Sequence, residues 1–256
     1  KDRAKASRAC VSRRRGRAAV NAHDVIARAR VQWGCRGNGA SLLVRAHMQS
    51  PIACDALPTL QPLDSALEWA TLYATAGDPS TFAWPRGGCG LLPSPIESCV
   101  LGGWEIALCS IPRAPSFRED RRKRRRRTDA EHLGVKGRVV TGGGVYKALD
   151  LPVLTVNAPV LEWRVCADRE RLRELLSTLH SLGRNGGAGL GEVAQWEIED
   201  DPEQPFLLPG KPLRPIPVAS RDEAIALYGP DVSVGVVAVR GPYWLRENRT
   251  LAALPC

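Results

Sequence analysis

The residues best suited to chemistry are five glycines within nine positions. They follow an amphipathic helix and precede an alternating strand, and they are Gly183, Gly186, Gly187, Gly189 and Gly191. A dinucleotide-binding turn has the opposite order, and a P-loop ends in Gly-Lys-Ser/Thr, so neither motif is present. Because glycine lets backbone N–H groups approach a phosphate closely, the stretch favours a loop that holds RNA by its backbone. Close packing of helix and strand is the alternative.

A run of basic residues is the second feature. The formal net charge of +9 is concentrated in residues 1–36 and 113–127, which carry +9 and +7, so the rest of the chain is acidic. Concentrated positive charge suits a polyanion such as nucleic acid, and arginine binds phosphate without reading sequence. A solvated tail or an arginine-rich codon bias is the alternative. The basic residues expected to contact phosphate are Arg184, Arg121, Arg122, Lys123, Arg124, Arg125, Arg126 and Arg127.

Two histidines are the candidates for acid–base chemistry. His180 lies three residues before the first loop glycine, and His47 ends the first expected strand. Either could act as a base in metal-independent RNA cleavage. We favour the alternative that both are ordinary surface histidines and that the protein is not an enzyme.

The cysteines and histidines match no zinc-binding spacing, so neither a metal nor another cofactor is expected. The eight cysteines are scattered, which indicates reduced thiols and a cytoplasmic protein. No apolar run approaches the roughly twenty residues that span a bilayer, so a membrane is not an expected partner.

Periodicity and capping residues place the elements that must position these groups. Helices are expected from Leu63 to a cap at Gly77, and from an N-cap at Asp168 to Gly183. KPLRPIP (211–217) reads as an extended connector. Strands are expected at 41–48, 100–110, 136–140, 161–166, 194–199 and 232–239, the last apolar enough for a central position.

This order predicts an α+β domain with ferredoxin-like, RRM-like βαββαβ topology. The domain covers residues 40–256. Residues 1–39 form a basic arm whose flexibility is left open, with a short helix at 23–30. The arginine-rich insertion, residues 111–134, is expected to stand out from the sheet as a hairpin or loop, with 136–140 as its return strand.

Four stretches together resemble a known family. They are LQPLDSALEWA (60–70), LHSLGRNGGAGLGEVAQWEIE (179–199), KPLRPIP (211–217) and RGPYWLRENR (240–249). In this order they are similar to the RAMP superfamily of CRISPR–Cas proteins, and more narrowly to the Cas-five-like subunit of type IV effector complexes, the Csf-three family. The likeness covers residues 41–256, and the arm has no counterpart in it.

The resemblance implies a non-catalytic prokaryotic protein that binds crRNA. In the superfamily such a subunit caps a filament of RAMP backbone subunits, contacts other effector subunits and holds the 5′ handle of the crRNA. The glycine loop would contact the RNA backbone, and the arginine run would lie in a thumb-like insertion. Arg214, Tyr243 and Trp244 lie in the matching stretches and join the expected RNA contacts, the two aromatics by stacking on a base.

Three hypotheses remain open at this stage. The leading one is the crRNA-binding architectural subunit, with the DNA duplex beside a target as a second possible ligand of the arginines. The others are a crRNA-processing endoribonuclease of the same superfamily and a general basic RNA-binding module.

Overall fold

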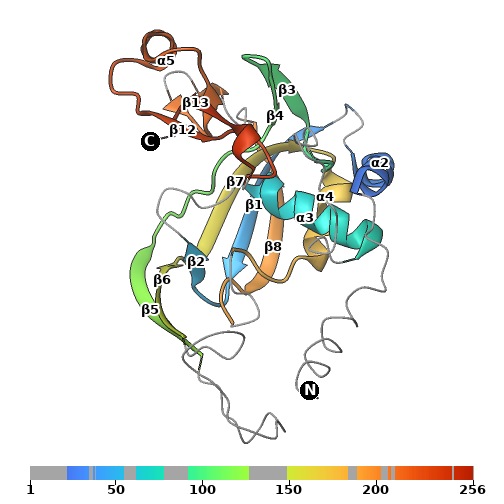
Figure 1. Ribbon diagram of the computed structural model, residues 1–256. Coiled ribbons are helices and arrows are strands. Elements are labelled where there is room, and N and C mark those ends of the chain that lie inside the picture. The colour runs from blue at the N-terminus through green and yellow to red at the C-terminus, as the bar shows by residue number, and fades with distance from the viewer. Residues whose placement is uncertain are drawn as a thin grey trace, which may run out of the picture.

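The computed structural model describes residues 22–34, 37, 39–54, 62–77, 92–126, 149–183, 189–202, 207–208, 211–243 and 245–255. It is a mixed α+β structure of small antiparallel sheets and helices (Figure 1). None of the helices in these residues is long and apolar enough to cross a membrane.

The central sheet has the order β7-β1-β8, with every neighbouring pair antiparallel. The three strands are β1 (Ala40–Met48), β7 (Val160–Ala167) and β8 (Val193–Asp200), which confirms the strands predicted in these regions. Alternation in β1 sends Leu42, Val44 and Ala46 to one fully buried face. That face forms the main core.

An irregular segment flanks the free side of β7. Isolated antiparallel bridges join Ile96, Cys109 and Arg113 to β7, and a hairpin of β3 (Ser98–Leu101) and β4 (Trp104–Ala107) projects between them. The prediction of one strand over 100–110 is therefore wrong. Gly102 and Gly103 both have positive φ and reverse the chain there.

Two helices cover the apolar face of the central sheet (Figure 1). Helix α3 (Leu63–Ala76) ends at Gly77 as predicted, where the Gly77 N–H bonds the Tyr73 carbonyl. Helix α4 (Arg169–Thr178) begins at the predicted cap, because the Asp168 carboxylate accepts the Arg171 N–H. It stops before the predicted end at Gly183, since the chain is already extended at Leu179.

Part of the predicted arm belongs to the body. Helix α2 (Ala22–Trp33) packs against α3 and buries Val25, Ile26, Ala29 and Trp33. Its apolar positions recur at helical spacing, which explains the burial of one face. Residues 1–21 lie outside the described residues.

The arginine run is built into a two-stranded ribbon, which extends from the body in Figure 1. It pairs β5 (Arg118–Arg126) with β6 (Leu149–Asn157), and β6 also pairs with β2 (Ile52–Cys54). The strand returning beside β5 is thus β6, and the insertion reaches Asn157. The predicted return strand at 136–140 lies outside the described residues.

The C-terminal region forms a separate small unit (Figure 1). Its three-stranded sheet has the order β11-β13-β12, so the predicted central strand is at an edge, where Val236 is 67% exposed. The apolar run misled because β12 pairs only with β13 among the described residues, and none of its five residues is buried. The elements are β9 (Leu207–Leu208), β10 (Lys211–Pro212), β11 (Ile216–Pro217), α5 (Arg221–Tyr228), β12 (Val234–Ala238), the 3₁₀ helix η5 (Arg246–Asn248) and β13 (Arg249–Ala253).

Candidate nucleic-acid interface

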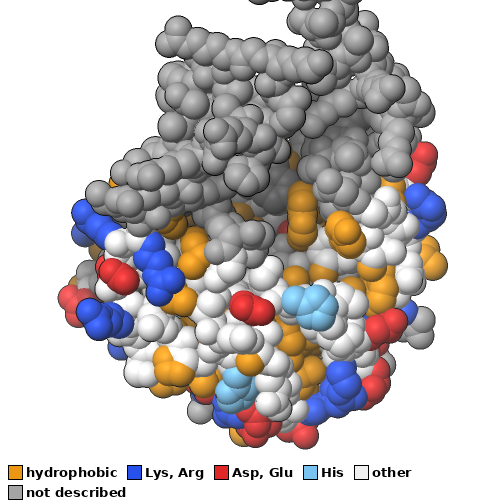
Figure 2. All heavy atoms as spheres, turned by 90° about the horizontal axis from the view of Figure 1, so that it is seen from below, with side chains coloured by type: hydrophobic (Ala, Val, Ile, Leu, Met, Phe, Trp, Pro, Cys, Tyr) orange, Lys and Arg blue, Asp and Glu red, His pale blue; other side chains and the backbone are white. Residues whose placement is uncertain are grey.

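The β5–β6 ribbon concentrates positive charge on an edge strand. Seven of the nine residues of β5 are Lys or Arg, and β5 has a strand partner only on its β6 side among the described residues. Arg118, Arg121 and Arg122 are exposed, and Arg127 lies outside the described residues. Figure 2 shows Lys and Arg side chains on the side of the molecule that carries the ribbon in Figure 1, and further ones at the opposite edge. Charged edges also protect sheets against aggregation, so the charge alone does not decide the role.

The ribbon is anchored firmly where it leaves the body. Thr155 and Val156 of β6 are fully buried, and the Thr155 hydroxyl donates to the Asp120 carbonyl at 3.2 Å. Pairing of β6 with β2 ties it to the chain that continues from β1. The backbone of the ribbon near this base is therefore held in place beside the body.

The base of the glycine loop is closed by backbone hydrogen bonds. The Leu182 N–H donates to the Gly191 carbonyl, and the Gly191 N–H donates to the Pro51 carbonyl, both at 2.8 Å. Gly191 is also buried. This corrects its predicted role, because its N–H is not available to a phosphate. Gly183 and Gly189 are exposed, whereas Arg184, Gly186 and Gly187 lie outside the described residues.

Two glycines of this loop are expected to tolerate alanine very differently. Both have positive φ, which costs an L-residue about 1–2 kcal/mol. A Cβ at Gly191 would lie 1.8 Å from the Leu182 carbonyl oxygen, whereas a Cβ at Gly189 meets nothing within 4 Å. We therefore expect Gly191→Ala to lower the free energy of unfolding by several times the loss in Gly189→Ala, measured by urea unfolding. Equal losses would contradict the closed loop base.

The two candidate histidines lie in different surroundings. His180 is exposed at the end of the α4 segment, and its carbonyl accepts the Val193 N–H. The Nε2 atom of His47 lies 3.3 Å from Glu197 Oε2 on the open face of the central sheet. Two histidines are visible on the face drawn in Figure 2, with hydrophobic side chains near them. The structure does not join the two into one acid–base pair through any hydrogen bond among the described residues.

On the open face of the central sheet, carboxylates already form ion pairs with Arg45. Arg45 pairs with Glu162 and Glu199 at 2.8 Å and with Glu197 at 3.4 Å. The hydrogen bond from His47, together with Arg45, lowers the pKa of the Glu197 carboxyl. Three glutamates surround one arginine, so this face offers a phosphate little electrostatic attraction. The open face is unlike the cationic ribbon.

Arg214 is not on the surface, which corrects its predicted contact with RNA. Its side chain is 1% exposed and bonds the carbonyls of Ala107, Cys109 and Val239, the last two at 3.1 and 2.9 Å. Burying a guanidinium requires such partners, so its role is to join the C-terminal unit to the body.

Tyr243 completes the same buried cluster. Its hydroxyl lies 2.9 Å from Arg214 Nη2 and donates to Asp64 Oδ2 at 2.7 Å, and Arg214 Nη2 lies 3.5 Å from the same carboxylate oxygen. The Tyr243 residue as a whole is half-buried, so base stacking on its ring stays a prediction. Trp244 lies outside the described residues.

The sequence reasoning missed the two carboxylates of this cluster, Asp64 and Glu68. Asp64 is fully buried and Glu68 is 3% exposed. Their spacing of four residues puts both on one side of α3, beside leucines at 63, 67 and 72 that are also buried. Two acids within an apolar helical stripe were the available signal.

Burial is the main reason that the pKa of the Glu68 carboxyl is raised well above its usual value, and the Asp64 carboxylate raises it further. In the folded state the Glu68 carboxyl keeps its proton at a pH where, in the unfolded state, it has already lost it, since its ordinary pKa is 4.5. We expect the free energy of unfolding to fall as pH rises from about 5 to 8, and Glu68→Gln to remove that fall. Urea unfolding at pH 5, 6.5 and 8 measures both. The matched control is Glu174→Gln, an exposed position on α4, which should keep the wild-type slope.

The described residues contain no group of three or more His, Cys, Asp or Glu side chains that could hold a metal ion. No known protein-family model matches the chain, and no curated protein sequence matches it either.

Proposed function

We propose that this protein is a non-catalytic RNA-binding subunit of a type IV CRISPR–Cas ribonucleoprotein. In this proposal it holds the 5′ handle of the crRNA and caps the filament of RAMP backbone subunits in the prokaryotic cytoplasm. The observation that carries the RNA-binding part is β5, an edge strand with seven basic residues in nine, on a ribbon anchored to an otherwise acidic body. The four-stretch resemblance supports the narrower assignment.

The proposed fold assignment is ferredoxin-like, with the ribbon as a thumb-like insertion. Chain order gives β1, α3, the segment 96–113, β7, α4 and β8, which reads as βαββαβ. In space the order is β8, β1, β7 and then the segment 96–113, with antiparallel contacts throughout. Helices that connect strands two places apart produce this order. Along the chain, the ribbon is inserted between the segment 96–113 and β7.

The proposed division of labour follows from geometry and charge. The ribbon attracts the phosphates. Its cations lie on a protruding strand, so a polyanion can bind them without approaching the carboxylates of the body, which would repel it. Exposed Gly189 of the glycine loop positions the RNA backbone. Buried Arg214 and Gly191 serve the fold and are excluded from the proposed contacts.

Sequencing the RNA that copurifies with the full-length chain and its neighbouring gene products tests the proposal. We expect enrichment of one 5′ handle from a repeat array, whereas RNA in proportion to the cellular pool would overturn it. The non-catalytic part is tested by incubating the protein with repeat RNA and EDTA. Site-specific cleavage that is lost in His180→Ala would establish the endoribonuclease alternative instead.

A further inference from the structure

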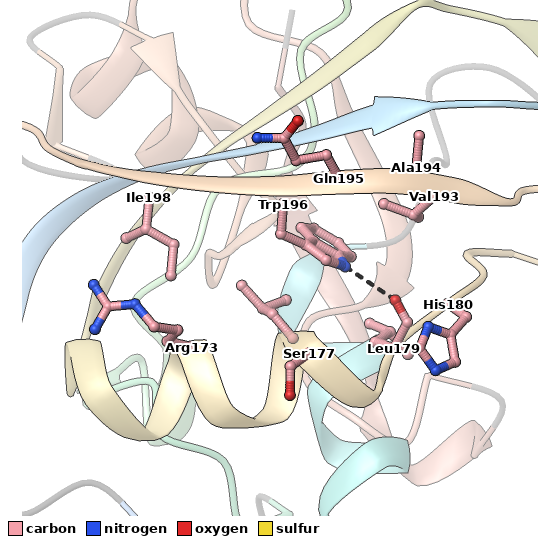
Figure 3. A pocket seen from close by; sticks show the side chains of 10 residues that line it. Arg173, Ser177, Leu179, His180, Val193, Ala194, Gln195, Trp196 and Ile198 are labelled. Carbon is pink, nitrogen blue, oxygen red and sulfur yellow. Dashed lines mark hydrogen bonds between the residues drawn. The ribbon is translucent and has the colours of Figure 1, made fainter.

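A groove of about 390 Å³ lies between α4 and β8 (Figure 3). Its apolar lining comes from Leu176 and Leu179 on the helix side and from Val193, Trp196 and Ile198 on the strand side. Trp196 is half-buried, so part of its ring remains open at an edge of the central sheet. A ligand with a flat apolar face would cover this surface.

The Trp196 ring is held in place before any ligand arrives. Its Nε1–H donates to the Leu179 carbonyl at 2.9 Å, the bond drawn in Figure 3. Its ring centroid lies 6.1 Å from that of buried Trp163, with the planes tilted by 39°. Because two contacts fix the indole, stacking on it requires little further ordering of the side chain.

The rim of the groove is polar, and none of the residues that line it is acidic. Arg173, Ser177 and His180 supply this rim from the α4 side. The Arg173 guanidinium pairs with exposed Glu170 at 2.6 Å, a type of surface pair that contributes little and that a phosphate can displace. An apolar floor with a polar rim that includes one arginine is complementary to a nucleotide, which joins a flat base to an anion.

The groove also opens where the glycine loop begins and ends. His180 precedes the loop, Val193 follows it, and both line the groove. The hydrogen bond from the Val193 N–H to the His180 carbonyl, 3.0 Å long, holds these two ends together. An RNA backbone held at the loop therefore passes the mouth of the groove.

We propose that this groove binds one unpaired nucleobase, stacked against Trp196, with its phosphate near Arg173 and His180. The inference rests on the proposed RNA-binding function and adds a ligand class to it, because a base within a duplex cannot enter the groove. An apolar side chain of a partner protein would fit the floor equally well. The arginine at the rim and the position of the groove at the loop favour the nucleotide.

The test fills the groove from its rim without changing the core. Ser177 is exposed, and its hydroxyl donates to the Glu174 carbonyl of its own helix, so Ser177→Trp places a ring at the mouth. Glu174→Trp, exposed on the same helix but outside the lining, is the matched control. The probes are a single-stranded RNA of mixed sequence and a duplex of the same length, and far-UV circular dichroism checks folding.

We expect Ser177→Trp to weaken single-strand binding about 5- to 150-fold, the range for losing one stacked base. Its salt slope for single strands should change by no more than about 0.7, the share of one phosphate contact. Duplex binding should not change, and Glu174→Trp should behave as wild type. If wild-type protein binds RNA and Ser177→Trp binds equally well, the groove inference fails while the proposed function stands. If Ser177→Trp instead loses only a copurifying protein, the occupant is a peptide and the inference is wrong. Wild-type protein that binds no RNA would refute the proposed function itself.

Discussion

Replacing the six basic residues at positions 121–126 with alternating threonine and glutamine is expected to flatten the salt dependence of RNA binding. Each lost phosphate contact removes about 0.7 from the slope of log K against log salt for single strands and about 0.9 for duplex DNA. Loss of all six contacts would change the slope by up to about 4 for single strands and about 5 for duplex DNA. Fluorescence anisotropy titrations at four salt concentrations between 50 and 300 mM measure the slope.

The matched control keeps the six positive charges and changes the shape of the side chains that carry them. A variant with lysine at all six positions retains the cations but loses the bidentate geometry of arginine. Its slope should stay close to wild type even if its affinity falls. Threonine is well tolerated in strands, so the neutral variant should keep the pairing of β5 with β6. An unchanged slope in the neutral variant would remove the ribbon from the binding surface.

The ribbon also shows why its geometry was hard to predict. A run of like charges repels itself and usually marks an unstructured segment, so the sequence indicated a protrusion of uncertain form. The register of β5 with β6 comes instead from the partner, residues 149–157, which reaches the body and buries Thr155 and Val156 there. A partner some thirty residues away leaves no local signal in the arginines.

Prediction succeeded where the local pattern is also the tertiary pattern. Strands β1, β7 and β8 alternate because one face of the sheet is buried, and α4 begins at Asp168 because its carboxylate caps a free N–H. Prediction failed where contacts between residues far apart in the sequence determine whether a side chain is buried. Nothing near Arg214 distinguishes it from a surface arginine, since its partners come from α3, from the β4 segment and from the chain after β12.

The glycine loop could be predicted from the sequence only in part. Its glycines were found by composition, but the sequence could not divide them into those that fold the loop and those that remain accessible. The division depends on the β1–β2 turn, because the Pro51 carbonyl takes the Gly191 N–H. Gly189 faces open space, and it is therefore the better candidate for contact with a phosphate.

Substituting buried Arg214 is expected to have the largest effect on stability. Arg214→Met removes the cation beside fully buried Asp64 and leaves the carbonyls of Cys109 and Val239 without their donor. Breaking a buried ion pair from one side typically costs about 3–5 kcal/mol, because the remaining charge is uncompensated. We expect a loss of that size in the free energy of unfolding, measured by urea denaturation at pH 7.

Two controls separate the buried pair from the loss of an arginine as such. Arg173→Met removes an exposed guanidinium paired with Glu170 and should cost less than about 1 kcal/mol. The double variant Arg214→Met/Asp64→Leu should recover part of the loss, because it removes the stranded carboxylate as well. If the double variant is instead less stable by the sum of the two single losses, the two groups do not interact. Arg214 would then stabilise the fold only through the carbonyl groups that join the C-terminal unit to the body.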